Sequence, residues 1–308
     1  MLQYLIILLD DTSTSFCHYK NPKTERRLIP IETLRQGIRF GMMENLMIQY
    51  VYPDYKLPSE YTDVIESIDH SKIKPVVDDV DVWVVDRICG IKADVPVVWR
   101  TDLQNLLAHE ADVASTLESV PRLNVVLTDM EKFTDDDFEK YKAFLGRLSD
   151  KLEKLYVGDK TMQLNLLTDR MMLKQMNNCG AGDATLTLAP NGKFYVCPGF
   201  YYEDEADSVG DLEHGLDIKN KQLYKLEYAP ICRHCDAYQC KRCIWLNRKT
   251  TLEVNTPSHE QCVIAHLERN ASRELLADIR KHGTFLPEQE EIKEIDYLDP
   301  FNIVNKWK

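Results

Sequence analysis

The fold of this chain is indicated most clearly by two stretches, CGAGDATLTLAPNGKFYVCP at residues 179–198 and CRHCDAYQCKRC at residues 232–243. With Cys262 they hold seven of its nine cysteines, in the order C-x12-G-x4-C, C-x2-C-x4-C-x2-C and a last C. Thiolates at this density bind soft metal, because zinc and iron–sulfur clusters each take four of them and a C-x2-C loop turns two sulfurs toward one centre. The spacing therefore predicts a metal-binding region.

Composition narrows the class of protein. With 308 residues and 44% hydrophobic content, the chain is long enough for a full core and is expected to divide in two. Its net charge of −12 argues against a nucleic-acid partner, because phosphate binding needs a basic face. The apolar residues 2–9 are too few to span a membrane and lack the flanks of a signal peptide, which predicts a cytoplasmic protein without a membrane partner. In that reducing compartment, clustered cysteines are expected to bind metal and not to form disulfides.

The first 176 residues alternate apolar runs with amphipathic stretches. Strands are predicted at 4–9, 46–51, 73–77, 80–85, 97–99, 123–128 and 164–167, and helices at 31–44, 59–68, 103–117 and 135–155. Continuous apolar strands separated by helical patterns indicate βα units around a parallel sheet. Six or seven units are too few for a closed eight-stranded barrel. The predicted fold class is therefore α/β, a partial (βα)6-type barrel with its chemistry at the C-terminal ends of the strands.

From residue 177 the pattern changes. Residues 184–197 read as a hairpin with a Pro-Asn-Gly turn at 190–192, and short helices are predicted at 220–228 and 270–281. The chain is accordingly divided into a barrel at 1–176, a small cysteine-rich domain at 177–284 and an acidic C-terminal segment at 285–308. That last segment either packs on the barrel or is mobile.

The cysteine order resembles the SPASM domain, a C-terminal module of many radical S-adenosylmethionine enzymes that modify peptides. That family's pattern is C-x9-15-G-x4-C, then C-x2-C-x5-C-x3-C, then a last C. All seven cysteines and Gly192 have counterparts here, and with the preceding βα half the resemblance covers nearly the whole chain. The departures are two gaps of the four-cysteine segment, each one residue shorter than in the family.

The resemblance implies two auxiliary four-iron four-sulfur clusters. By position the ligands are Cys179, Cys197 and Cys243 for the first cluster, and Cys232, Cys235, Cys240 and Cys262 for the second. The first set is one ligand short of four, so that cluster is either open to peptide or completed by another group. The altered spacing leaves the assignment of Cys240 and Cys243 open. Zinc is the alternative metal, because C-x2-C pairs are equally good zinc ligands.

The N-terminal half lacks the motif that binds S-adenosylmethionine in such enzymes. They carry C-x3-C-x2-C on the loop after the first strand, whereas residues 10–30 read DDTSTSFCHYKNPKTERRLIP and contain only Cys17. The glycine-rich stretch expected after the second strand is replaced by YVYPDYKL at residues 50–57. We therefore expect this chain neither to bind S-adenosylmethionine tightly nor to cleave it.

A degenerate radical S-adenosylmethionine half joined to a complete SPASM-like half resembles the CXXX repeat peptide maturase family. The segments LLDDTSTSFCHY at 8–19 and NLMIQYVYPDY at 45–55 carry this resemblance. It implies maturation of a ribosomally made peptide with a cysteine at every fourth residue. Two alternatives stay open: a non-catalytic scaffold that presents peptide to a partner modifying enzyme, and a zinc-stapled interaction protein.

Five residues are weak candidates for catalysis at the predicted barrel mouth. Asp10, Asp11, Cys17 and His18 follow the first strand, and Arg100 follows a later one. The aspartates either bind a cation or a peptide amine, or cap the loop and the next helix by accepting backbone N–H groups. Cys17 beside His18 is either a reactive thiol or a lone ligand, and a Cys–His nucleophile pair is disfavoured because neighbours in an extended loop point in different directions. The arginine pairs with a peptide carboxylate or with a nearby aspartate. Cys89 is expected to be a small buried hydrophobe.

Overall fold

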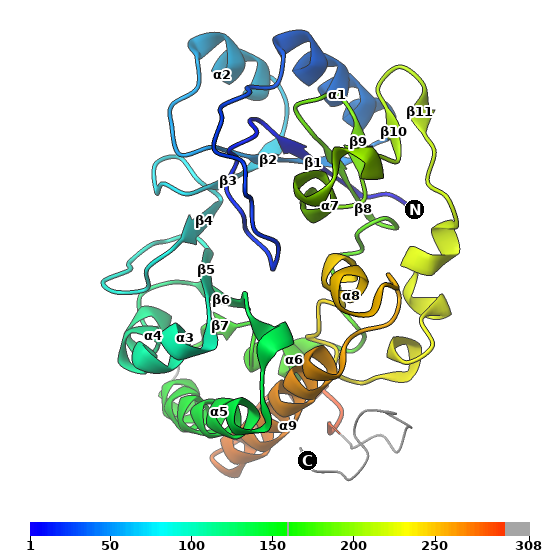
Figure 1. Cartoon of the computed structure of the whole chain (residues 1–308). Helices are drawn as coiled ribbons and strands as arrows, with labels where there is room; N and C mark the ends of the chain where they lie inside the picture. The colour runs from blue at the N-terminus through cyan, green and yellow to red at the C-terminus, as the bar shows by residue number, and fades with distance from the viewer. Residues whose placement is uncertain (159, 293–308) are drawn as a thin grey trace.

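A computed structural model describes residues 1–158 and 160–292. A nine-stranded sheet forms an open arc with helices on its outer side (Figure 1). The strands are β1 (Tyr4–Leu8), β2 (Met47–Val51), β3 (His70–Lys74), β4 (Val82–Val85), β5 (Val97–Thr101), β6 (Arg122–Leu127), β7 (Gln163–Leu164), β8 (Thr185–Leu188) and β9 (Phe194–Tyr195). The helices are α1 (Ile31–Met43), α2 (Ser59–Ile65), α3 (Leu103–Ala108), α4 (Glu110–Leu117), α5 (Asp135–Val157), α6 (Thr168–Met172), α7 (Pro198–Glu203), α8 (Ile244–Thr251) and α9 (His259–Lys281).

The strand order confirms the predicted fold class. The first seven strands lie side by side in chain order, each parallel to the next, and β8 pairs in parallel with the free side of β1. In this sheet β9 alone is antiparallel, as the second strand of the predicted hairpin. A parallel sheet whose strands follow one another in sequence, but whose ends do not meet, is a partial barrel. The cysteine-rich part thus contributes a hairpin to the sheet of the βα part.

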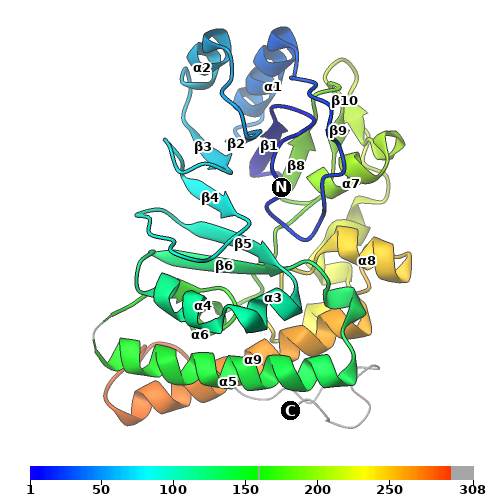
Figure 2. The same ribbon diagram turned by 60° about the vertical axis from the view of Figure 1, so that its left-hand side comes forward.

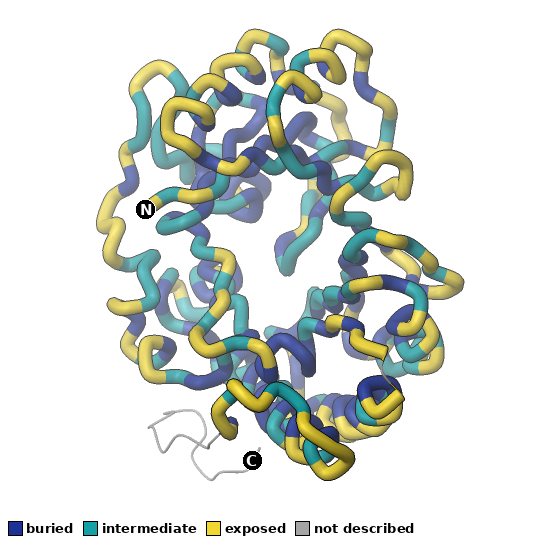
Figure 3. The backbone as a smooth tube through the Cα atoms, turned by 180° about the vertical axis from the view of Figure 1, so that it is seen from behind, coloured by how far each residue is buried: buried dark blue, intermediate teal, exposed yellow. Residues whose placement is uncertain are grey.

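Helices cover the outer face of the arc at both ends (Figure 2). One core cluster packs α1 and α2 against β1, β2 and β8. A larger cluster joins β5 and β6 to α5, α9 and the interior of the arc. The two longest helices, α5 and α9, make the most extensive contact between elements and lie together at one end of the molecule. Seen from behind, the inner strands are mostly buried and the outer turns exposed (Figure 3).

Several predicted elements differ in their limits. The helix expected at 103–117 is two helices, because His109 has a non-helical backbone and its ring Nδ1 donates to the carbonyl of Asn105 at 2.9 Å. The strand expected at 73–77 ends at Lys74, since Pro75 has no N–H for the ladder. Residues 220–228 form two short 3-10 turns, η3 (Lys221–Tyr224) and η4 (Leu226–Tyr228). Residues 270–281 are the second half of α9.

The C-terminal segment is described only as far as residue 292. Phe285 and Leu286 pack against the larger core cluster, and Ile292 is buried in it. Arg280 on α9 donates to the carbonyls of Phe285, Leu286 and Gln289. This part of the segment therefore packs on the barrel, and the rest of the predicted tail lies outside the described residues. Among the described residues, no helix combines the length and the apolar character needed to cross a membrane.

Candidate metal centre

The loop that follows β1 turns back into the interior of the arc (Figure 1). Its base is closed by a bridge between Asp10 and Leu28 and by the N–H of Ile29, which donates to Leu9. Within the loop, Ser13 donates through its hydroxyl to the carbonyl of Val51 at 2.8 Å. Because these bonds tie both ends of the loop to β1 and β2, its tip (residues 16–19) is placed inside the barrel.

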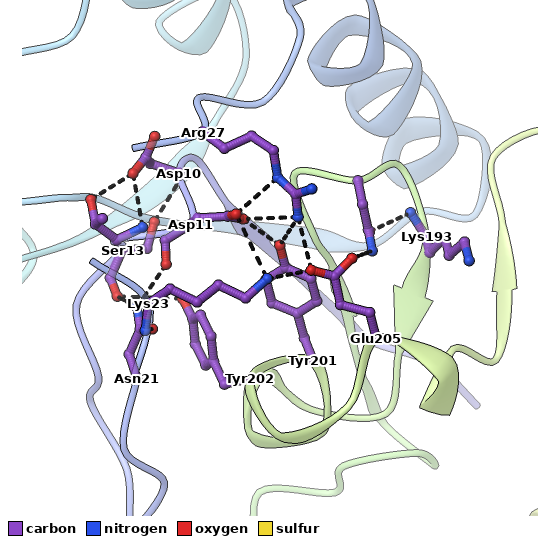
Figure 4. Close-up of polar contacts among 12 residues, drawn as sticks. Asp10, Asp11, Ser13, Asn21, Lys23, Arg27, Lys193, Tyr201, Tyr202 and Glu205 are labelled. Carbon is purple, nitrogen blue, oxygen red and sulfur yellow. Dashed lines mark hydrogen bonds and ion pairs between the residues drawn. The ribbon is translucent and has the colours of Figure 1, made fainter. Parts of the chain in front are cut away.

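The paired aspartates at the start of this loop have structural partners (Figure 4). Asp10 is fully buried and accepts from the amide of Thr12 at 2.8 Å and from the hydroxyl of Tyr55 at 2.9 Å. Asp11 pairs with Arg27 Nε at 2.8 Å and accepts from the hydroxyl of Tyr201. Both aspartates thus hold the loop in place. Asp10 does so in part by accepting a backbone N–H, as the capping alternative expected, whereas Asp11 is held by side chains.

The ion pair of Asp11 belongs to a larger network that joins the loop to α7 (Figure 4). Glu205 pairs with Arg27 at 3.0 Å and also with Lys23. These cations, with Asn191, lower the pKa of Glu205 to about 2, although its burial acts in the opposite direction. The network therefore fastens the N-terminal loop to the hairpin and the segment after it.

Arg100 holds the tip of the loop from the opposite side of the arc. Its Nε donates to the carbonyl of Cys17 at 2.8 Å and its Nη2 to the carbonyl of Tyr19 at 2.6 Å. Burial lowers the pKa of this guanidinium, opposed by nearby Tyr19, Cys17 and Asp86. Neither a peptide carboxylate nor an aspartate partner is needed to explain its position.

A cavity of about 390 Å³ lies between the loop tip, the barrel strands and the cysteine-rich region. That space is many times the roughly 30 Å³ of one water molecule. Five cysteines line it: Cys17, Cys179, Cys197, Cys240 and Cys243. Cys179 is exposed, so the cavity reaches the surface at that residue, whereas Cys17, Cys197 and Cys243 are only partly exposed. The three residues assigned to the first cluster by position are thus brought together.

The thiols in this cavity are strongly desolvated. Burial raises the pKa of Cys17 to about 12 and raises that of Cys197 and Cys243 as well, with the neighbouring thiols adding to the shift. Backbone amides act the other way: those of Phe200 and Gly199 on Cys197, and that of Leu246 on Cys243. Such thiols become thiolates only when a metal replaces their protons.

His18 also lines the cavity, although neighbouring residues in an extended loop were expected to point apart. Its Nδ1 donates to the carbonyl of Leu127 at 2.8 Å. Burial lowers the pKa of the imidazole, opposed by that hydrogen bond. A neutral ring whose Nδ1 carries the proton presents Nε2 as an acceptor or a metal ligand.

The second cysteine group surrounds a smaller void. Cys232, Cys235, Cys240 and Cys262 line it together with His266, whose Nε2 lies 3.7 Å from the sulfur of Cys235. Burial raises the pKa of Cys232 to about 11 and of Cys240 to about 12, and nearby thiols of the group add to both shifts. The void of about 20 Å³ has the size of a single water or ion. A four-iron four-sulfur cluster is larger than this void.

Cys240 and Cys243 both line the larger cavity, and Cys240 also lines the smaller void. Burial raises the pKa of both thiols; Cys232 and Cys235 add to this effect for Cys240, and Cys197, Cys179 and Cys17 add to it for Cys243. The assignment of Cys240 and Cys243 to different clusters stays a prediction. Within residues 1–158 and 160–292, no group of three or more His, Cys, Asp or Glu side chains is arranged to hold a single metal ion.

Buried donors without partners lie beside both groups. Arg242 lines both voids and is 3% exposed, yet its Nε and Nη1 have no hydrogen-bond partner among the described residues. The indole Nε1 of Trp245, another residue of the larger cavity, has none in the same part of the chain. Unpaired buried donors are costly. Sulfur atoms of a cluster are acceptors that would satisfy them.

Sequence reasoning missed Glu268, which lines the larger cavity from α9. Burial raises the pKa of its carboxyl to about 7, and the hydroxyl of Tyr141 donates to it at 2.7 Å. An acidic residue on the apolar side of the helix, between Ile264 and Leu275, was the available signal. Cys89, expected to be buried, is exposed and lies apart from both groups, because it follows β4 in a surface loop.

The fold is similar to that of anSMEcpe, an anaerobic sulfatase-maturating radical S-adenosylmethionine enzyme. Native anSMEcpe with bound AdoMet and Cp18Cys peptide superimposes with a TM-score of 0.63 at 12% identity, over 91% of this chain and 99% of that one. The hexahistidine-tagged form with AdoMet and the native form with AdoMet and Kp18Cys peptide each give 0.60 at 12% identity, covering 91% and 90% of this chain and 99% of theirs. No protein-family model matches the chain, and no curated protein matches its sequence.

Proposed function

We propose that this protein takes part in the maturation of a ribosomally made peptide, and that it binds the peptide without cleaving S-adenosylmethionine itself. The observation that carries the proposal is the cysteine-lined cavity at the barrel interior. It lies in a fold similar to that of an enzyme crystallised with peptide. The precursor we propose is a cysteine-repeat peptide of the CXXX type.

The cofactors we propose are auxiliary four-iron four-sulfur clusters. Cys179, Cys197 and Cys243 hold the first, in a cavity with room for it and with unpaired donors beside it. Cys232, Cys235, Cys240 and Cys262 hold the second metal centre. There a single zinc ion is the specific alternative, because the void is small. Bound clusters supply redox chemistry or a soft surface for thiols.

S-adenosylmethionine is not expected to be cleaved, because the loop after β1 has one cysteine where three thiolates are required. The test is an anaerobic assay of the reconstituted protein with a strong reductant, in which 5′-deoxyadenosine is measured. We expect no product above the level of a protein-free control. Clear production by the purified chain would contradict this part of the proposal.

Peptide binding is tested with a cysteine-repeat peptide and its serine-substituted copy. Burying a hydroxyl without a partner costs about 1–3 kcal/mol, whereas a thiol behaves as a small hydrophobe in the same place. We therefore expect the cysteine peptide to bind the reconstituted protein about tenfold more tightly or better, by calorimetry. Equal affinity would favour the scaffold alternative, in which this chain only presents peptide to a partner enzyme. Binding of neither peptide would contradict the proposed function.

A further inference from the structure

Cys17, the one cysteine of the loop after β1, lies with the three ligands assigned to the first cluster. All four of these cysteines line the same cavity. Burial raises the pKa of Cys17, Cys197 and Cys243, and the neighbouring thiols of the same set add to that effect. Cys240, the fifth cysteine there, also lines the smaller void with Cys232 and Cys235. Cys17 therefore shares the larger cavity with the three thiols assigned to the first cluster.

We propose that Cys17 is the fourth ligand of the first cluster, so that one four-iron four-sulfur cluster is held jointly by the barrel loop and the cysteine-rich region. The inference rests on the proposed function in one respect, namely that this cavity binds an iron–sulfur cluster. A four-iron cluster takes four thiolates. The set of three assigned by position lacks one, and Cys17 supplies it without any group from outside the chain.

The loop holds Cys17 in position through its backbone. Arg100 donates to the carbonyls of Cys17 and Tyr19, and the ring of His18 donates to Leu127 on β6. Tyr19 is 3% exposed and stacks on Tyr202 at 5.6 Å between ring centroids. These contacts hold the main chain of the loop at Cys17 and in the two residues that follow it. Such preorganisation is what a metal ligand requires.

Charges around Cys17 suit an anionic centre. A cluster with four thiolates is negatively charged, and burying it uncompensated is costly. The positive charges of Arg100 and Lys241 act on Cys17. The unpaired indole N–H of Trp245, noted above for the described residues, is a donor for a cluster sulfur. These groups come from β5, the loop at 232–243 and α8, which surround the thiols from different directions.

A closed cluster changes what the site does. With Cys17 as ligand, a peptide thiol reaches iron only by displacing Cys17. The first cluster then stabilises the junction of the loop and the cysteine-rich region, and peptide recognition falls to the remaining lining of the cavity. Cys17 is then not available as a ligand for a cluster at the position where the related fold binds S-adenosylmethionine.

The experiment compares the wild type with Cys17→Ala, Cys17→Ser, His18→Ala and Cys89→Ser, all reconstituted anaerobically with iron and sulfide. His18→Ala tests the other ligand type at the loop tip, and Cys89→Ser controls for loss of an exposed cysteine. Electron paramagnetic resonance of oxidised and reduced samples is recorded, with iron and sulfide per chain. Circular dichroism establishes that each variant folds. If Cys17→Ala does not fold, Cys17→Ser, which nearly keeps the volume of the side chain, takes its place.

For Cys17→Ala we expect a three-iron signal in the oxidised sample and the loss of about one iron per chain, because the unligated iron leaves. Addition of 2-mercaptoethanol with iron should restore the four-iron spectrum, and Cys17→Ser should shift the spectrum of one cluster. The inference would be overturned if both Cys17 variants gave the same spectra as Cys89→Ser. It would also be overturned if the three-iron signal appeared only in His18→Ala. In either case the proposal that the protein binds clusters would still stand. A wild type that takes up no iron would overturn the proposed function itself.

Discussion

Asp11 and Arg100, two residues considered as candidates for catalysis, make structural contacts. Asp11 is bound by Arg27 and Tyr201, and Arg100 by two carbonyls of the loop tip. Asp11 follows β1, as expected from the sequence, whereas Arg100 lies within β5 and not after it. Their partners were beyond prediction, because Tyr201 lies 190 residues from Asp11 along the chain. Backbone acceptors leave no pattern in a sequence.

Arg100 offers a test at this scale. Arg100→Ala leaves the carbonyls of Cys17 and Tyr19 without their donors, and an unsatisfied buried polar group costs about 1–3 kcal/mol. We expect the free energy of unfolding in urea to fall by at least that amount and amide exchange in residues 13–19 to quicken. Arg35→Ala, which removes only an exposed pair with Glu32 at 3.6 Å, should change stability by less than about 0.5 kcal/mol. Equal effects of the two substitutions would contradict the role given to Arg100.

At the scale of elements, periodicity predicted most of the βα half because apolar strands and amphipathic helices repeat there. Helices α1 and α5 begin at the predicted residues, and α5 has the capping box formed by Thr134 and Asp137. Helices α7 and α8 were missed. Each begins directly after a cysteine, Cys197 and Cys243, so that their first residues read as part of a metal-binding loop. The pairing of β8 with β1 joins residues about 180 apart and has no local signature.

Glycine in α1 gives a test of how closely that helix approaches the sheet. A methyl group at Gly37 would overlap the side chain of Leu188 on β8, whereas one at Gly146 in α5 would meet nothing within 4 Å. We expect Gly37→Ala to lower the free energy of unfolding by about 1–3 kcal/mol through overpacking. Gly146→Ala should raise it by about 0.5–1 kcal/mol, because alanine is the better helix former. The free energies of unfolding of the two variants are measured by thermal or urea unfolding. Stabilisation by both substitutions would show that α1 packs less tightly against the sheet than described.

At the scale of the whole molecule, the cysteine spacing predicted two neighbouring sets of cysteines but gave no place to Cys17. Cys179, Cys197 and Cys243 line the larger cavity, Cys232, Cys235 and Cys262 line the smaller void, and Cys240 lines both. Cys17 was treated as part of a different, incomplete site. Its position beside Cys243 depends on how a loop near the N-terminus folds back into the arc, and that requires the complete sheet.

The central claim is that the larger cavity binds an iron–sulfur cluster through residues of the cysteine-rich region. It is tested most directly by counting iron and acid-labile sulfide per chain in the anaerobically reconstituted wild type, in Cys197→Ser with Cys243→Ser, and in Cys89→Ser. Since one four-iron four-sulfur cluster is removed, we predict that the double variant loses about four iron and four sulfide relative to both other proteins. Unchanged iron content in the double variant, or a wild type that binds zinc and no iron, would contradict the claim.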